Sequence, residues 1–332
     1  MSSYIIRRVF IMVPTLFMIS ALIFAIMEWP PGNYFDTYVA ELEAQGEPAD
    51  LKEIEELRAE YGFDKPPIGR YFRWVTGLLQ GDMGYSFEYE LPVQDVVGSR
   101  LWLTLLVSFV SVLFTWVIAF PIGIYSATHQ YSWGDYGLTF FGLLGLATPN
   151  FLLALIFMYF ANIWFDVSIG GLMDVEFKNQ DMSWAKFVSI LEHLWIPVII
   201  IGTAGTAAMI RRLRANLLDE LQKQYVVTAK AKGLPPFKAL RKYPLRMSLN
   251  FFISDIGSLL PAMISGAEVT AIVLSLETTG PLLIRALKAQ DMYLAGSFLM
   301  ILAAFTVIGV LISDIALALL DPRIRLQGGS TK

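Results

Sequence analysis

Long, nearly uncharged runs of apolar residues recur along the chain and alternate with polar segments. Runs close to or above the length of a membrane span lie at residues 9–28, 101–128, 136–165, 194–210, 247–267 and 292–320. About 20 residues of α-helix cross the ~30 Å hydrocarbon core of a bilayer. A helix satisfies its backbone hydrogen bonds within the segment, as lipid requires. The pattern therefore predicts an all-α integral membrane protein with six transmembrane helices.

The first run follows Arg7 and Arg8, an arrangement that also opens a secretory signal peptide. It is longer than the apolar region of a signal peptide, and no small-x-small cleavage site follows it. We therefore expect residues 9–28 to remain in the protein as its first transmembrane helix.

Charge differs strongly between the segments that connect these runs. Residues 28–100 contain 15 acidic and 6 basic side chains, whereas residues 211–246 contain 10 basic and 2 acidic. Residues 166–193 are also acidic, with 5 acidic and 2 basic side chains. Basic loops remain in the cytoplasm, so the N- and C-termini are expected to be cytoplasmic. The connecting segments are then a cytoplasmic N-terminus at 1–8, outer loops at 29–100, 166–193 and 268–291, a cytoplasmic loop at 211–246 and a cytoplasmic C-terminus at 321–332.

Composition limits the chemistry available to the chain. Apolar residues make up 55% and charged residues 16%, with a mean hydropathy of +0.56, which again favours a membrane protein. Cysteine is absent, and His129 and His193 are the only histidines, so disulfides are excluded and no metal site is expected. The sequence has no G-x-x-x-x-G-K-[ST] phosphate-binding loop. Because no nucleophile–base pair stands out either, an enzyme is disfavoured and no bound cofactor is expected.

The long segment at 29–100 contains one clear amphipathic pattern, PADLKEIEELRAEYGF. Leu51, Ile54, Leu57 and Tyr61 recur at helical spacing, and Gly62 is suited to end the helix. One interpretation is a surface helix that rests on the rest of the domain. The other is a docking surface for a partner outside the membrane.

The basic loop, residues 211–246, carries the most distinctive local pattern. A helix is predicted over 216–232, with an apolar stripe of Leu217, Leu218, Leu221, Tyr225 and Ala229. Gly233 is expected to end it, because glycine adopts the left-handed conformation at little steric cost. The stripe needs a covering surface, and this chain has no soluble domain large enough to provide one. The pattern therefore points to another subunit.

A second short helix is expected directly after this glycine. Pro235 cannot continue the first helix, because proline lacks a backbone N–H and restricts the residue before it. The second helix could begin at Pro236 and carry Phe237, Leu240 and Tyr243, and Pro244 would close it before the fifth span.

Several stretches of the chain resemble one family of transporters in order and over nearly the whole length. Ala229, Ala231 and Gly233 in YVVTAKAKG resemble the EAA-type loop of importer permeases in the ATP-binding cassette (ABC) superfamily. More narrowly, the chain resembles the first permease subunit of the dipeptide/oligopeptide/nickel importers. The other matching stretches are YIIRRVFIMVPTLF (4–17), YGFDKPPIGRYFRWVTGLLQGDMGYSF (61–87), ATPNF (147–151), GAEVTAIV (266–273) and DPRIR (321–325).

The resemblance implies a type I ABC importer permease fold in a bacterial or archaeal cell membrane. It implies that the chain forms a heterodimer with a second homologous permease. Two cytoplasmic ATPase subunits or domains would hold ATP and Mg, and an extracytoplasmic protein would bind the substrate. Nucleic acid is not an expected partner. The helix before Gly233 would be the coupling helix seated in the ATPase. The residues assigned to this coupling are Gln222, Gln224, Tyr225, Thr228, Ala229, Ala231, Lys232, Gly233 and Leu234.

The chain departs from the family pattern at two places in the basic loop. Gln224 stands where relatives usually carry an acidic residue, which leaves any charge contact at that position in doubt. The stretch Tyr243-Pro244-Leu245-Arg246-Met247 stands where His-Ala-Leu-Arg-Asn is common. Neither departure removes the helix or its glycine.

Polar residues within the spans are the candidates for a translocation path or gate: Thr148, Pro149, Asn150, Asp255, Ser258 and Asp314. Ionisable residues at membrane depth are functional candidates because their insertion is costly. The alternative for Asp255 and Asp314 is pairing with Arg211, Arg212 or Arg246. The proline at 149 could serve a packing kink or a hinge, and the small residues of 202–208 favour close packing of the fourth span.

Cargo and mechanism each leave an alternative open. Peptides are the first candidate cargo, but residues 274–298, LSLETTGPLLIRALKAQDMYLAGSF, resemble the oligosaccharide-importing relatives more closely. An ion-coupled secondary transporter is the alternative of another class, with Asp255 and Asp314 as ion carriers. It is disfavoured because residues 101–128 contain no acidic or basic side chain and no inverted repeat is evident.

Overall fold

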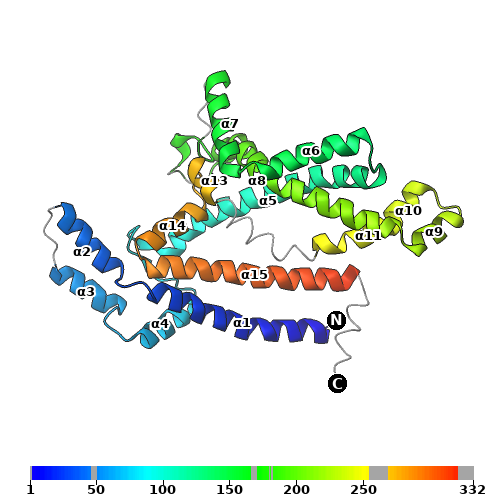
Figure 1. The fold of residues 1–332 in the computed structure, drawn as a ribbon. Coiled ribbons are helices and arrows are strands. Elements are labelled where there is room, and N and C mark those ends of the chain that lie inside the picture. Colours follow the sequence, from blue (N-terminus) through cyan, green and yellow to red (C-terminus); the bar gives the residue numbers. More distant parts are fainter. Residues whose placement is uncertain are drawn as a thin grey trace. The chain divides into compact units, whose positions relative to one another are not determined.

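The computed structural model describes residues 2–45, 51–165, 170–178, 180, 182–253 and 268–320, which are mostly helical (Figure 1). Its helices are α1 (Ser2–Glu28), α2 (Tyr34–Gln45), α3 (Leu51–Tyr61), α4 (Pro67–Gln80), α5 (Val93–Thr128), α6 (Trp133–Ala147), α7 (Asn150–Phe165), the 3₁₀ helix η1 (Val175–Phe177), α8 (Trp184–Leu221), α9 (Gln224–Ala231), α10 (Pro236–Lys242), α11 (Pro244–Ser248), α13 (Glu268–Val273), α14 (Thr279–Lys288) and α15 (Met292–Leu320). Strands β1 (Tyr85–Ser86) and β2 (Leu91–Pro92) pair antiparallel.

Four helices in the described part of the chain are long and apolar enough to cross a membrane. They are α1, α5, α15 and the Trp184–Thr203 part of α8, and each overlaps a span that the sequence predicts. Both α5 and α8 are longer than the predicted spans at 101–128 and 194–210. The predicted fifth span, 247–267, lies mostly outside the described residues, which stop at 253 and resume at 268.

The third predicted span is not one continuous helix. The sequence predicts a span over 136–165, but the structure has α6 and α7 there, and the two helices meet at 97°. Pro149 explains the break, because its ring disfavours a helical conformation at the preceding residue. Thr148 is accordingly extended, with φ −92° and ψ 120°. The segment is therefore a broken span or a re-entrant pair of helices.

The chain forms two compact units. The first comprises Met1–Leu103 and Thr278–Leu311, and the second comprises Thr104–Glu277 and Ile312–Lys332. Helices α5 and α15 are each divided between the two units. Residues 93–103 of α5 and 292–311 of α15 belong to the first unit, and the remainder of each helix belongs to the second.

A cluster of aromatic rings forms the core of the first unit outside its long helices. Phe87, at the end of β1, is buried, and its ring lies 4.8 Å from Phe35, 4.9 Å from Tyr61 and 5.4 Å from Tyr34, centroid to centroid. Such pairs contribute about 0.5–1.5 kcal/mol beyond the burial of their area. We call the described residues 34–45 and 51–92, together with 278–293, the aromatic module. Its amphipathic helix α3 packs Tyr61 into this core, which favours the predicted role of a helix resting on its own domain.

A buried carboxylate holds the aromatic module to the start of α15. Asp291 is 0% exposed and accepts hydrogen bonds from Ser86 Oγ at 2.7 Å, the Leu294 N–H at 3.0 Å and the Glu88 N–H at 3.3 Å. Burial raises the pKa of the Asp291 carboxyl, and these hydrogen bonds act in the opposite direction. The sequence analysis did not identify Asp291, because its partners at 86 and 88 are remote in sequence.

The phenol of Tyr34 gives the aromatic module a measurable pH dependence. Burial, together with the charges of Glu88 and Asp291, raises its pKa from 10.0 to about 12, and its hydroxyl donates to the Phe87 carbonyl at 3.0 Å. A pKa raised in the folded state contributes stability that is complete below pH ~10 and is lost as the pH rises towards ~12. We expect protection of the module against hydrogen exchange to fall across this interval.

The matched variant for this prediction is Tyr34→Phe, which removes the titrating phenol and keeps the ring. Its module should be less stable at neutral pH, because the hydrogen bond to Phe87 is lost, but should lose less protection between pH ~10 and ~12. Identical pH profiles for the two proteins would contradict the prediction.

In the second unit, α8 packs closely against α5 and α6 through glycines. A Cβ built on Gly123 of α5 would lie 2.9 Å from the Leu213 side chain, and one on Gly145 of α6 would lie 2.6 Å from Thr203 Cγ2. In the other direction, a Cβ on Gly202 of α8 would lie 2.6 Å from the Phe114 ring. The prediction that small residues of the fourth span serve helix packing is confirmed for Gly202.

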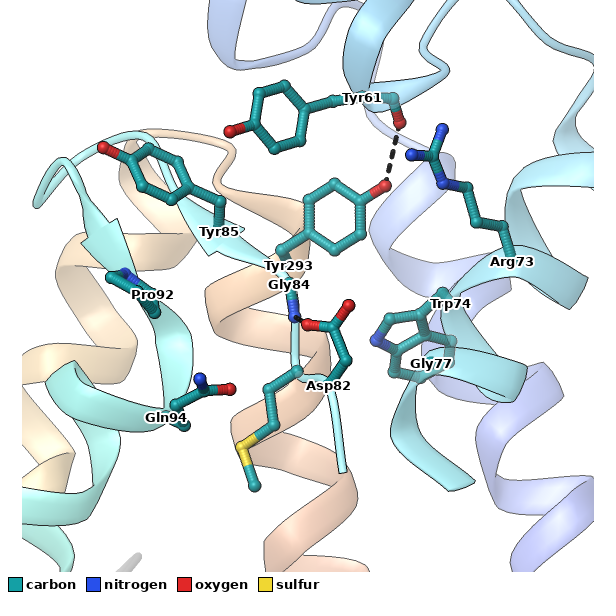
Figure 2. Close-up of a pocket in the computed structure, with 11 residues that line it drawn as sticks. Tyr61, Arg73, Trp74, Gly77, Asp82, Gly84, Tyr85, Pro92, Gln94 and Tyr293 are labelled. Atoms are coloured by element: carbon teal, nitrogen blue, oxygen red, sulfur yellow. Dashed lines mark hydrogen bonds between the residues drawn. The ribbon is translucent and has the colours of Figure 1, made fainter. Parts of the chain in front are cut away.

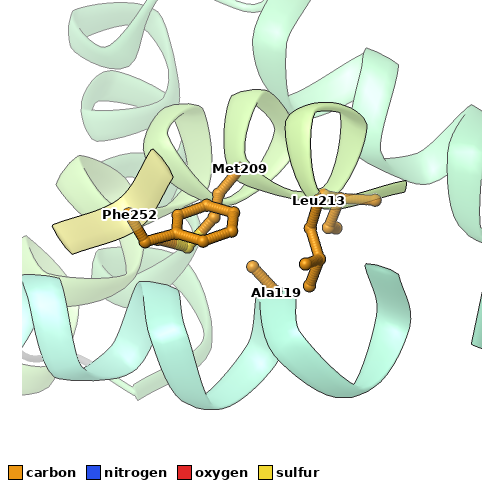
Figure 3. Packing of buried hydrophobic residues seen from close by; sticks show 5 residues of the cluster. Ala119, Met209, Leu213 and Phe252 are labelled. Atoms are coloured by element: carbon orange, nitrogen blue, oxygen red, sulfur yellow. The ribbon is translucent and has the colours of Figure 1, made fainter. Parts of the chain in front are cut away.

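An apolar cluster continues this packing towards the basic loop. It is formed by Ala119 of α5, Met209, Ile210 and Leu213 of α8 and Phe252 (Figure 3). Phe252 also makes an edge contact with Phe120 of α5, with 5.3 Å between ring centroids. The cluster therefore holds the segment after α11 against α5 and α8.

Candidate functional site

The basic loop is built from α9 and α10, and not from the continuous helix that the sequence predicts over 216–232. Helix α8 ends at Leu221, Gln222 caps it, and Lys223 is extended, with φ −67° and ψ 145°. Helix α9 then begins at Gln224. The break separates Gln222 from the other predicted coupling residues, so the rigid segment is shorter than predicted. No glycine or proline marks this break in the sequence.

The end of α9 is as predicted. Gly233 has φ +79°, the left-handed conformation, and its N–H donates to the Lys230 carbonyl at 2.9 Å. The Leu234 N–H donates to the Ala229 carbonyl at 3.1 Å. Together these bonds satisfy carbonyls that the helix leaves without partners. Gly233 thereby reverses the chain between α9 and α10.

The second short helix begins at Pro236, as predicted, and ends at Lys242. Pro244 does close it, but it also begins a further helix, α11, because proline fits the first turn of a helix, where no N–H is needed. After α8, the basic loop thus consists of two short helices joined by the four residues 232–235, followed by a third short helix.

Little of the predicted apolar stripe is available to another protein. Leu217 and Ala229 are buried within this chain, Leu218 and Leu221 are partly buried, and Tyr225 is exposed. Val226 and Ala229 of α9 and Ala239 of α10 are buried within this chain, at 1%, 6% and 1% exposure. Large apolar side chains remain exposed on the same two helices, namely Val227 at 51% and Phe237 at 71%. Ala229 is therefore a packing residue of the basic loop, and the surface open to a partner includes Val227 and Phe237, which the sequence analysis did not select.

Most of the other predicted coupling residues are also exposed to solvent. Gln224, Thr228, Ala231 and Lys232 are exposed, and Leu234 is partly buried. Tyr225 donates a hydrogen bond to Glu220 at the end of α8, and its pKa is raised by burial and by that bond. This contact bridges the break between α8 and α9. The family pattern expects an acidic residue at position 224, which is Gln224 in this chain. The acidic residue closest to it in sequence is Glu220, and its carboxylate is engaged by Tyr225.

The candidate path residues do not gather at one place in the described structure. Thr148, Pro149 and Asn150 form the corner between α6 and α7, and Asp314 lies partly buried in the second half of α15. Asp255 and Ser258 lie outside the described residues. The neighbour of Asp314, Ser313, donates to the Ile253 carbonyl at 2.5 Å, which holds the end of α15 beside the start of the predicted fifth span.

A cavity of about 320 Å³ opens in the aromatic module between α4, the two strands and α15 (Figure 2). Three tyrosine rings, Tyr61, Tyr85 and Tyr293, line it, and Arg73 and Asp82 add one charge of each sign. The Tyr293 hydroxyl donates to the Tyr61 carbonyl at 3.0 Å, as the dashed line in the figure marks. The cavity is thus a polar, aromatic hollow, and sequence reasoning did not identify it.

Comparison with known proteins identifies the family of the chain. The family model described as "Binding-protein-dependent transport system inner membrane component" matches residues 119–326, which include α8, the basic loop and all of α15. Similarity to individual proteins extends further and covers the aromatic module as well.

The chain is 33% identical over 328 residues to the oligopeptide transport system permease protein AppB of Bacillus subtilis, with 98% of this chain and 99% of that protein covered. It is 29% identical to a putative peptide permease protein of Brucella ovis, with 98% and 100% covered. It is 27% identical to the peptidoglycan transport system permease protein YejB of Agrobacterium fabrum, with 98% and 99% covered.

Proposed function

The chain belongs to the family of inner membrane components of binding-protein-dependent transport systems, and on that premise we propose that it is a permease subunit that imports peptides with the energy of ATP. The observation that carries the proposal is the turn from α9 to α10 at Gly233, placed within a chain that is similar throughout to an oligopeptide permease. The protein is a multi-pass component of the inner membrane. In this role it forms half of the translocation path.

The energy for transport comes from partner chains in this proposal. Two cytoplasmic ATPase subunits or domains bind ATP and Mg, a second homologous permease completes the path, and an extracytoplasmic protein delivers the cargo. The basic loop and both termini lie in the cytoplasm, because loops rich in Lys and Arg are retained there. The aromatic module then lies on the outer side.

The exposed side of the α9–α10 hairpin is the surface that we assign to the ATPase. Val227 and Phe237 supply apolar contacts, and Lys230 and Lys232 surround them with positive charge. Val226, Ala229 and Ala239 fasten the hairpin to its own chain. Closure of the ATPases would move the hairpin, and the helices attached to it would change the access of the path from the inner to the outer side.

The aromatic module is the surface that we assign to the binding protein. It carries most of the acidic residues of 28–100, it is held together by Phe87 and Asp291, and it contains the cavity between Arg73 and Asp82 (Figure 2). A rigid platform of this kind keeps the binding protein in one orientation while cargo is released.

Peptides are the cargo that the relatives favour, since two of the three relatives compared above are named as peptide or oligopeptide permeases. The third is named for peptidoglycan, which keeps an oligosaccharide-containing cargo as the second candidate. Sequence similarity of residues 274–298 to oligosaccharide importers supports that second candidate.

The test is uptake by proteoliposomes that contain the full complex of permeases and ATPases together with the binding protein. We expect uptake of short peptides to require ATP and the binding protein. Uptake of oligosaccharides alone would replace the peptide assignment. Uptake by this chain without ATPases, driven by an ion gradient, would overturn the proposal in favour of a secondary transporter.

A further inference from the structure

An ion pair with a buried carboxylate joins α6 to the first part of the basic loop, at the end of α8, and the function proposed above does not use it. Asp135 is 2% exposed, in the first turn of α6. Its Oδ1 accepts from Arg214 Nε at 3.0 Å and its Oδ2 accepts from Arg214 Nη2 at 2.8 Å. This two-point geometry fixes the orientation of the two side chains as well as their distance.

The carboxylate is also part of the turn between α5 and α6. The Tyr131 N–H donates to Asp135 Oδ2 at 3.0 Å, and the Asp135 N–H donates to Ser132 Oγ at 3.1 Å, which caps α6. Tyr131 has φ +63°, an unusual conformation for a residue other than glycine. A side chain built on Gly134 would lie 2.5 Å from the Tyr125 hydroxyl. Asp135 is therefore held by the turn, and the turn has little room to rearrange around it.

Arg214 places the other half of the pair on α8, the helix that leads to α9 and α10. It lies seven residues before Leu221, the last residue of α8, or about 10 Å along the helix axis. The contact of Tyr225 with Glu220 then joins α9 to that helix end. A displacement of α9 consequently reaches the end of α8 through this hydrogen bond, and it then reaches Arg214 along α8, which is continuous from Arg214 to Leu221.

Stability alone does not account for this arrangement. Removing the Asp135 carboxylate from water is costly, and the Arg214 side chain that pairs with it stays 27% exposed, which weakens the attraction that offsets this cost. The contacts of Gly145 with Thr203 and of Gly123 with Leu213 already pack α8 against α6 and α5. The ion pair adds a geometric restraint to this packing, because its two hydrogen bonds resist both sliding and rotation of α6 against α8.

We infer that the Asp135–Arg214 pair is a mechanical clamp that makes the end of α8 and the α5–α6 turn move as one body. Through it, a displacement of the α9–α10 hairpin by the ATPase reaches α5 and α6, and not α8 alone. The inference rests on the proposed function, since it assumes an ATPase on the hairpin. Asp135 and Arg214 are positioning residues in this account and do not contact cargo.

The test compares Asp135→Asn, Arg214→Gln and the charge-reversed double variant Asp135→Arg with Arg214→Asp in the complete transporter. Asp219→Asn, an exposed carboxylate on the same helix, is the matched control. The readout is the number of ATP molecules hydrolysed per cargo molecule taken up. We expect both single variants to raise this ratio about tenfold, within the usual range of coupling between sites. The double variant should recover part of the loss, and the control should equal the wild type.

The outcomes separate this inference from the function on which it rests. If the wild-type complex shows no ATP-dependent uptake, the proposed function fails. If the wild type is coupled and Asp135→Asn keeps the wild-type ratio, the clamp is wrong and the function stands. Where Asp135→Asn does not assemble, Arg214→Lys decides, because it keeps the charge but not the two-point contact; an unchanged ratio in that variant would overturn the inference.

Discussion

Replacement of Gly233 by valine is expected to uncouple ATP hydrolysis from cargo uptake while leaving the chain inserted in the membrane. Gly233 has φ +79°, and a Cβ added there would meet no atom within 4 Å. The cost is therefore in the backbone, roughly 1–2 kcal/mol for a residue with a Cβ in this conformation, and it is larger for a β-branched side chain. The hairpin relieves this strain by changing the angle between α9 and α10.

The change of angle matters because Val227 and Phe237 lie on different helices of the hairpin. If the two helices turn relative to each other, the two side chains no longer fit one surface of the ATPase together. We expect ATP hydrolysis to lose its stimulation by cargo, and uptake to fall about tenfold, in the reconstituted complex. Hydrolysis in the absence of cargo and the amount of the chain in the membrane should be unchanged.

Gly233→Asn is the matched control, because asparagine adopts the left-handed conformation far more readily than valine. It should retain most of the activity. Wild-type levels of stimulated hydrolysis and uptake in Gly233→Val would show that the ATPase does not depend on the geometry of this turn.

Replacement of Asp291 by alanine is expected to open the aromatic module. The substitution leaves Ser86 Oγ and the N–H groups of Glu88 and Leu294 without an acceptor. An unsatisfied buried donor costs about 1–3 kcal/mol, and Ser86 and Leu294 are buried whereas Glu88 is exposed, so a loss of roughly 2–6 kcal/mol of local stability is the expected scale. We expect fast hydrogen exchange over 85–92, measured by mass spectrometry.

The control for this variant is Asp64→Ala, which removes an exposed carboxylate from the same module. It should change hydrogen exchange little. Asp291→Asn should fall between the two, since its amide can still accept one hydrogen bond through its oxygen. Equal protection of residues 85–92 in Asp291→Ala and the wild type would show that the aromatic rings alone hold the module closed.

Local chemistry made the turn of the basic loop predictable. A positive φ favours glycine at 233, and the missing N–H of Pro236 suits the first turn of a helix. The break between α8 and α9 carried no such mark, because Leu221 through Gln224 are all compatible with a continuous helix. The sharpness of the bend before Pro149 was likewise unpredictable, since a proline inside a span can kink it slightly or break it.

The ion pair and the buried carboxylate were missed for a different reason. Asp135 and Arg214 are 79 residues apart, and Asp291 and Ser86 are 205 residues apart. The residues next to Asp135 and Asp291 in the sequence do not indicate which distant residue either carboxylate contacts. A serine three residues before an aspartate, as at Ser132 and Asp135, is typical of a helix start; that pattern was not used in predicting the third span, and it carries no information about Arg214.

The glycine contacts around α8 imply a pattern of covariation in relatives of this chain. Gly123 faces Leu213, Gly145 faces Thr203 and Gly202 faces Phe114, each at a distance that leaves no room for a further methyl group. A relative with a larger residue at one of these positions should carry a smaller residue at the facing position. Evolutionary change at this seam should therefore occur in pairs, and single substitutions there should be rare.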